Sequence, residues 1–402
     1  MPKGGSLLVR LALAAALMAA TLPAGASTLR EAFESAAAQN PDLRSLEARR
    51  STLEARLRGA NALTPGAAST TLSYTTDRLT QNRGFIEAEV EVGIPIWMPG
   101  QARAQRGLVD AETNRLQALI ALQRLTLAGE VRDAYWAWAA ADAALAAARA
   151  RAGSAAALAG DVRRQARGGQ MSEADELLAS ADAAEAEVAL REAELTLREA
   201  RLAFRTLTGR DPRAGWQEVP RDAAAPPEHP RLVAARLGQD VGRAVLRVAV
   251  VEDRESPEIG LFTRQERDNR DSGWDTRLGV RVRIPFAHPP RNAERRAAAE
   301  AEITTAAAES SAIERAVAAE RERARAALVD ARTTLRLIEA RHGALVRANG
   351  LSEAAFRQGQ TPLAETLRLR ASLAAADGER RRTQVALRRA ASRLNQAIGV
   401  EP

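Results

Sequence analysis

The chain contains no cysteine, and this absence limits how it can be held together. Without thiols it forms neither disulfides nor a thiolate metal site, and lipidation of its N-terminus through a cysteine is excluded. Aromatic residues make up only 3% of the 402 residues, whereas alanine, leucine, arginine and glutamate are abundant. A thick globular core needs more large apolar side chains, so this composition indicates extended helices.

Signals for enzyme chemistry and for nucleic-acid binding are also missing. The formal net charge is +7, but acids and arginines are interspersed. The arginine runs at 380–382 and 388–389 lack the aromatic platforms of a nucleic-acid surface and are typical of solvated helix faces. The three histidines are scattered, and no nucleophile motif or phosphate loop occurs. We therefore expect no catalytic residues, no cofactor and no bound metal; any metal would pass through the protein.

The chain begins with a short hydrophobic run. Lys3 and Arg10 flank its start, the run extends from Leu11 to Leu22, and the sequence Pro-Ala-Gly-Ala ends at Ala26. A charged region, a short apolar stretch and an Ala-x-Ala site form the pattern of a secretory signal peptide. The run is too short to span a membrane, which takes about 20 residues. We predict a signal peptide over residues 1–26.

Prolines and glycines mark an internal repeat with an offset of about 190 residues. The corresponding positions are Asn40-Pro41 with His229-Pro230, Ile94-Pro95 with Ile284-Pro285, Gly169-Gln170 with Gly359-Gln360, and Gly209 with Gly399. An offset that is kept across helices, strands and turns indicates a tandem duplication. We expect a first repeat over 27–209, a proline-rich linker over 210–228 and a second repeat over 229–402.

Each repeat is predicted to contain a helix entered through proline, two strands, a very long helix and a returning helix. The expected ranges in the first repeat are Pro41–Leu63, Ser69–Leu79, Phe85–Ile96, Gln101–Arg167 and Ser172–Thr208. Those in the second are Pro230–Glu252, Glu258–Glu266, Asp275–Phe286, Arg291–Arg357 and Pro362–Ile398. Apolar residues in the long helices are spaced by four and seven, which predicts a narrow seam for coiled-coil packing.

The strands alternate apolar and charged residues with a period of two. The apolar rows are Ile86, Ala88, Val90, Val92 and Ile94 in the first repeat, and Leu278, Val280, Val282 and Ile284 in the second. The charged rows are Glu87, Glu89 and Glu91, and Arg277, Arg281 and Arg283. This alternation, over about ten residues, suits a transmembrane barrel with a lipid-facing apolar row and a charged lumen. A half-exposed strand of an ordinary antiparallel sheet is the alternative.

The number of strands has a further consequence. Four strands cannot close a transmembrane barrel, and an open sheet edge is not tolerated in lipid. Several chains must therefore contribute their strands to one barrel. By the repeat offset, Glu87 corresponds to Arg277 and Glu91 to Arg281, so we expect acidic and basic rows to face one lumen. Trp97, Trp274 and Phe286 lie at strand ends, where aromatic girdles occur.

Taken together, the helix starts, the Ile-Pro strand exits and the Gly-Gln turns resemble the outer-membrane efflux protein (TolC) family over essentially the whole mature chain. The resemblance implies a mainly α fold with a small β part. Three chains would contribute four strands each to a 12-stranded outer-membrane β-barrel, continued by a periplasmic α-barrel of long antiparallel coiled-coil helices. Family members are passive exit ducts of tripartite efflux systems and work with a periplasmic adaptor protein and an inner-membrane transporter. The short chain and short surface loops resemble the heavy-metal cation (CzcC-like) branch, for which we expect a transporter of the resistance-nodulation-division type.

The resemblance also gives roles to the two turns that follow the long helices. Adaptor tips dock there in the family, and the matching residues are Gly168, Gly169, Gln170, Gly359, Gln360 and Thr361. Asp175 and Glu365 match the acids that constrict the family's pore. Acids in the first turn of a helix are also favoured by the helix dipole, and Arg368 replaces the second acid expected one turn later.

Two classes of function remain open at this point. The first is a trimeric duct in the outer membrane, extending into the periplasm, that exports small solutes or heavy-metal cations. Within this class, a duct for type I protein secretion is the alternative, because the transporter selects the cargo. The second class is a periplasmic structural coiled-coil protein that never enters a membrane. A sheet that proves to be soluble would favour this second class.

Overall fold

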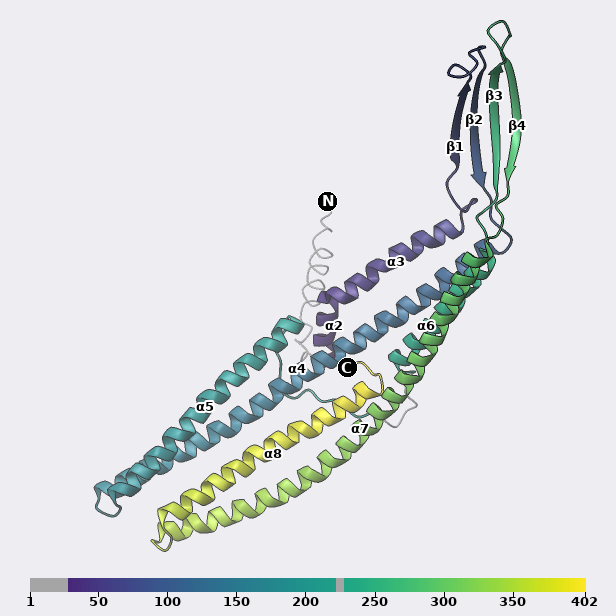
Figure 1. Cartoon of the computed structure of the whole chain (residues 1–402). Coiled ribbons are helices and arrows are strands. Elements are labelled where there is room, and N and C mark those ends of the chain that lie inside the picture. The colour runs from purple at the N-terminus through teal and green to yellow at the C-terminus, as the bar shows by residue number, and fades with distance from the viewer. Residues whose placement is uncertain (1–27, 222–227) are drawn as a thin grey trace, which may run out of the picture. The chain divides into compact units, whose positions relative to one another are not determined.

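The computed structural model describes residues 28–221 and 228–402, so the predicted signal peptide and part of the predicted linker lie outside the described residues. The first elements are α2 (Leu29–Gln39), α3 (Pro41–Ala60), β1 (Ser69–Thr76), β2 (Ile86–Pro95), α4 (Gln101–Arg167) and α5 (Glu173–Thr208). They are followed by α6 (Pro230–Val251), β3 (Glu258–Arg267), β4 (Asp275–Arg283), α7 (Pro289–Arg357) and α8 (Leu363–Ala397) (Figure 1). Among these described helices, none combines the length and the apolarity needed to cross a membrane.

Local signals set most helix boundaries. Helices α3 and α6 begin at the predicted prolines. At the start of α6 the ring nitrogen Nδ1 of His229 accepts the backbone N–H of Arg231 at 3.1 Å. Helix α5 ends at Gly209, whose φ of 68° lies in the left-handed region that favours glycine. Helix α7 begins at Pro289, two residues before the predicted start, because proline is accommodated in a first helical turn.

Helix α2 is missing from the predicted elements. The side chain of Thr28 accepts the backbone N–H of Glu31 at 3.3 Å and caps the helix. A Thr-x-x-Glu spacing is a recognised start signal for a helix, so the sequence did contain the information. Leu29, Phe33 and Ala36 of α2 are buried, and the helix contacts α5.

The described residues divide into two compact units, and each unit contains parts of both predicted repeats. Unit 1 comprises the described parts of Met1–Asn40, Arg124–Pro227 and Ala319–Pro402. Unit 2 comprises Pro41–Gln123 and Glu228–Ala318. Each long helix therefore contributes one part to each unit, and the β-sheet belongs entirely to unit 2.

The sheet in unit 2 has the order β1-β2-β3-β4, and all neighbouring strands are antiparallel (Figure 1). Strand β1 ends at Thr76, three residues before the predicted end. The reason is a loop anchored on Asp77, whose carbonyl accepts the N–H of Thr80 at 2.9 Å and whose carboxylate accepts the N–H of Arg83 at 2.7 Å. Strand β4 ends at Arg283 rather than at the predicted Phe286, ahead of Pro285, which has no N–H to donate.

The core of unit 1 follows the predicted seam of α4. Leu127, Val131 and Trp138 of the seam are buried. The adjacent Tyr135 ring stacks on Trp216 at a centroid distance of 4.8 Å, and the Tyr135 hydroxyl accepts the N–H of Trp216 at 3.1 Å. Burial raises the pKa of Tyr135, although the hydrogen bond from Trp216 acts in the opposite direction. The described part of the predicted linker is thereby fixed to α4.

Candidate functional site

One face of the sheet is apolar and exposed. It carries the predicted apolar rows of β2 and β4 together with residues of β1 and β3 in the same register. Its larger exposed side chains are Leu72, Tyr74, Val90, Val92, Ile94, Ile259, Leu261, Leu278, Val280 and Val282. Leu278 is 83% exposed and Leu72 is 75% exposed. A contiguous apolar surface of this kind marks an interaction with lipid or with another protein.

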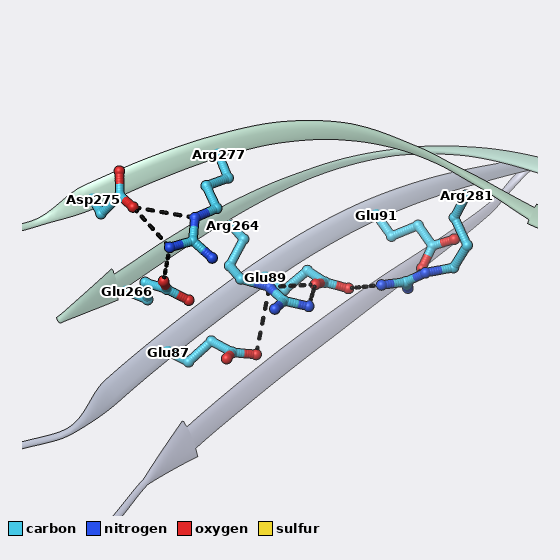
Figure 2. A network of polar contacts seen from close by, with 8 residues as sticks. All are labelled: Glu87, Glu89, Glu91, Arg264, Glu266, Asp275, Arg277 and Arg281. Carbon is cyan, nitrogen blue, oxygen red and sulfur yellow. Dashed lines mark hydrogen bonds and ion pairs between the residues drawn. The ribbon is translucent and has the colours of Figure 1, made fainter. Parts of the chain in front are cut away.

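The opposite face of the sheet carries a network of ion pairs centred on Glu89, as Figure 2 shows. The Glu89 side chain is 8% exposed and accepts from Arg264 at 2.6 Å and from Arg281 at 2.7 Å. Arg281 also pairs with Glu91, and Arg264 lies 3.6 Å from Glu87. A buried carboxylate needs such partners, because an unpaired buried charge is strongly unfavourable.

The charged rows therefore share one face, but their strands are not neighbours. Strand β3 lies between β2 and β4, and it supplies Arg264 to the network. Arg277 pairs with Glu266 of β3 at 2.6 Å and with Asp275 at 3.1 Å, not with Glu87. Sequence reasoning missed Arg264 and Glu266, although they continue a period-two row along β3. Arg283 lies 3.9 Å from Glu258.

Two glycines on this face leave room for the larger side chains of the network and of Phe262. A side chain at Gly260 would collide with the carboxylate of Glu91, which passes over this glycine on its way to Arg281. The Phe262 ring covers Gly279 in the same manner. The guanidinium groups of Arg281 and Arg264 lie 4.9 and 5.9 Å from the Phe262 ring centroid, within the range of cation–π attraction.

The two turns with predicted docking residues have the same geometry. Gly169 and Gly359 adopt φ angles of 73° and 71°, and the following residue donates its N–H back across the turn in both cases. Gln170 donates to Gln165 at 2.9 Å, and Gln360 donates to Ala355 at 2.9 Å. This is the Schellman arrangement that ends many helices. Both turns adjoin one apolar cluster formed by Leu158, Ala159, Val162, Ala179 and Leu363, with Met171 and Phe356 packed against it.

The predicted constriction acids lie in the first turns of the returning helices. Asp175 forms a capping box with Ser172: the Ser172 hydroxyl accepts the N–H of Asp175 at 3.1 Å and donates to its carboxylate at 2.7 Å. Glu365 is exposed in the first turn of α8, where Pro362 provides no side-chain cap. The local chemistry therefore gives Asp175 a structural role whether or not it lines a pore.

Clustered metal ligands are not found in the part of the chain that the structure describes. There, no group of three or more His, Asp and Glu side chains is placed to hold an ion. The charged sheet face is instead an extended surface, in which carboxylates and guanidinium groups pair with one another.

The fold is that of a mainly helical protein with a four-stranded antiparallel sheet, as found in outer-membrane channels of the TolC type. VceC from Vibrio cholerae superposes with a TM-score of 0.74 at 17% identity, covering 92% of this chain and 96% of that one. A membrane protein from Pseudomonas aeruginosa gives 0.75 at 20% identity, with 92% and 93% covered. The CmeC channel of Campylobacter jejuni gives 0.72 at 16% identity, with 92% and 85% covered. Because these sequence identities are low, the structural likeness establishes the fold alone.

A sequence comparison gives a family match over part of the chain. The model of the outer membrane efflux protein family matches residues 32–210, which correspond to the first predicted repeat. A comparison with curated proteins gives no significant match. The match supports the resemblance to the family but does not distinguish the heavy-metal cation branch. The predicted location, an outer-membrane barrel with helices extending into the periplasm, agrees with the family match and with the fold.

Proposed function

We propose that this chain is the outer-membrane exit duct of a tripartite efflux system and works as a homotrimer with one shared 12-stranded barrel. The observation that carries the proposal is the two-faced sheet. Its apolar face is exposed over all four strands, and its other face carries the paired charges around Glu89. In a transmembrane barrel the apolar face would contact lipid and the charged face would contact the water of the lumen. Its partners would be a periplasmic adaptor protein and an inner-membrane transporter.

A periplasmic coiled-coil protein is the weaker proposal. In water, Leu278, Leu72 and Val280 would leave a large apolar surface in contact with solvent, which is unfavourable. The family match over residues 32–210 also favours the duct. Polypeptides are the alternative cargo, because the fold of the duct does not depend on what the transporter delivers.

Small solutes or heavy-metal cations are the proposed cargo, delivered by a transporter of the resistance-nodulation-division type. The charged face supports this proposal. Over the four strands it carries six acids and four arginines, and none of the four β1 residues on this face is charged. The acids are Glu87, Glu89, Glu91, Glu258, Glu266 and Asp275, and the arginines are Arg264, Arg277, Arg281 and Arg283. The excess of negative charge attracts cations.

Docking of the adaptor is proposed at the two turns. Gln170 and Gln360 are exposed, so their side chains are available to a partner. Changing both to arginine should abolish co-purification of the adaptor while the trimer stays intact, because the turns are held by backbone hydrogen bonds. Arg347→Gln, at an exposed position on α7 ahead of the turn, is the control. Undiminished adaptor recovery with the double variant would place docking elsewhere.

The proposed gate consists of Asp175 and Glu365, whose six carboxylates in a trimer would ring the periplasmic opening. Such a ring binds multivalent cations more tightly as the opening narrows. In planar bilayers, Asp175→Asn with Glu365→Gln should abolish block by multivalent cations added on the periplasmic side. This experiment also tests the duct itself, since a protein that forms no channel gives no current.

The capping box supplies the matched control for the gate. Ser172→Ala removes the cap, at a cost of about 0.5–2 kcal/mol in helix stability, but keeps both carboxylates. We expect block by multivalent cations to persist in this variant. If block by multivalent cations is kept in both variants, or lost in both, Asp175 and Glu365 act only as helix-start acids.

A further inference from the structure

The two edge strands of the sheet have no partner strand among residues 28–221 and 228–402. Strand β1 pairs only with β2, and β4 pairs only with β3. All residues of β1 are exposed, as are most of β4. Unpaired backbone N–H and C=O groups are not tolerated in lipid, so both edges require a strand from another copy. The register of that seam is what the structure allows us to infer, on the basis of the proposed trimeric duct.

The chain contains an internal template for the seam, namely the β2–β3 junction that joins one repeat to the other. The sequence repeat relates Ile94 to Ile284, and therefore Gly93 to Arg283. Within the hairpins, Ser69 lies opposite Gly93, and Glu258 lies opposite Arg283. Ser69 therefore corresponds to Glu258. The repeat offset is therefore 189 residues between β1 and β3, one less than the 190 residues between β2 and β4. The helix starts Pro41 and Pro230 are also 189 residues apart.

Applying this correspondence to the β2–β3 junction gives the register between copies. In the junction, Gly93 lies opposite Gly260. Their counterparts in the other strands are Arg283 of β4 and Thr71 of β1. We propose that β4 pairs antiparallel with β1 of a second copy, with Arg283 opposite the second copy's Thr71. In the same register, Val280 on the apolar face lies opposite the second copy's Tyr74.

The register is consistent with barrel closure. Val92 of β2 lies opposite Leu261 of β3, which lies opposite Val280 of β4. By the repeat, however, the counterpart of Val92 is Val282. Crossing two strands therefore shifts the register by two residues. Two residues of about 3.3 Å over two strand spacings of about 4.8 Å give a strand tilt of about 35°. Closed barrels have tilts of about 35–45°. Slipping the seam by two residues gives about 19° in one direction, which is outside this range, and about 46° in the other, which is at its upper limit. The choice between the last register and the proposed one therefore rests on the β2–β3 template.

The proposed seam differs in chemistry from its template. At the internal junction Glu89 lies opposite Arg264, and the two form an ion pair. The counterparts at the seam are Gly279 and the second copy's Thr75, which carry no charge. Arg281 and Arg283 face the hydroxyl groups of the second copy's Ser73 and Thr71. The seam between copies is therefore joined by backbone hydrogen bonds and hydroxyl contacts, whereas ion pairs hold the sheet together within each copy.

Cysteine cross-linking measures the register directly, because the chain has no cysteine of its own. Directly opposed residues have Cα atoms about 4.5–5.5 Å apart, which a disulfide can bridge, whereas positions two residues off are about 7–8 Å apart. Within one chain, the two edges are separated by three strand spacings, about 14 Å, so any disulfide joins two copies.

Three double variants share Arg283→Cys and combine it with Thr71→Cys, Ser69→Cys or Ser73→Cys. After mild oxidation of the detergent-extracted protein, we expect the Thr71 variant to run mainly as a covalent trimer on non-reducing gels. The other two should cross-link at least about tenfold less. Tyr74→Cys with Val280→Cys repeats the test on the apolar face, which covers the case in which a variant at Arg283 fails to fold.

The native mass before oxidation separates the two ways of failing. A trimer that cross-links preferentially through Ser69 or Ser73, or through none of the pairs, overturns the register and leaves the proposed duct standing. A wild-type protein that is monomeric in detergent overturns the duct and the seam together.

Discussion

Replacing Arg132 by methionine is expected to lower the free energy of unfolding by about 3–5 kcal/mol. The Arg132 side chain is 4% exposed and pairs at 2.7 Å with Glu218, which is 11% exposed. Glu218 also accepts from the hydroxyl of Ser392, and Arg132 donates to Gln396. Removing the guanidinium leaves a carboxylate in the interior of unit 1 without its cation. Breaking one partner of a buried pair is costly for this reason.

Chemical or thermal unfolding, followed by circular dichroism in detergent, measures this loss. The double variant Arg132→Met with Glu218→Leu should recover most of the stability, because no unpaired charge then remains. Arg191→Met is the control, since its ion pair with Glu187 is exposed and should contribute little. A loss for Arg132→Met no larger than that of the control would contradict the role given to this buried pair.

Replacing Glu87, Glu89 and Glu91 by arginine is expected to abolish the stable trimer or to make any remaining channel prefer anions. In the wild type, Arg264 and Arg281 pair with these glutamates. The change places new guanidinium groups beside both arginines. Each chain would go from six acids and four arginines on the charged face to three acids and seven arginines. Like charges at this distance repel, and a positive lumen attracts anions.

Native mass in detergent and reversal potentials in planar bilayers report the two effects. Adding Arg264→Glu and Arg281→Glu to the triple variant restores opposite charges and should restore assembly. Replacing the three glutamates by glutamine separates loss of charge from reversal of charge, and should weaken cation preference without reversing it. Unchanged selectivity in the triple arginine variant would show that this face does not line the lumen.

Much of the fold was predictable because its signals are local. Proline at helix starts and the period of two along the strands set the order of elements before any tertiary contact is known. Helix α4 begins and ends at the predicted residues. Helix α2 was missed although Thr28 and Glu31 signal its start. Strand β1 was predicted too long, because the loop that ends it depends on hydrogen bonds to the Asp77 carboxylate.

The candidate site was less predictable because its partners are far apart in the sequence. The rows of Glu87 and Arg277 were recognised, and the structure places both on one face of the sheet. Their actual partners depend on strand order, which puts β3 between β2 and β4. No local pattern connects Glu89 to Arg264 or shows that Gly260 leaves room for Glu91. Likewise, the pair of Arg132 and Glu218 links α4 to a proline-rich segment without periodicity.

The most direct test of the proposed duct is the native mass of the mature protein after detergent extraction from the membrane fraction. The exposed apolar face predicts recovery from the outer membrane. Four strands per chain in the proposed 12-stranded barrel predict a complex of three chains. A monomer recovered from the soluble periplasmic fraction would contradict the proposal.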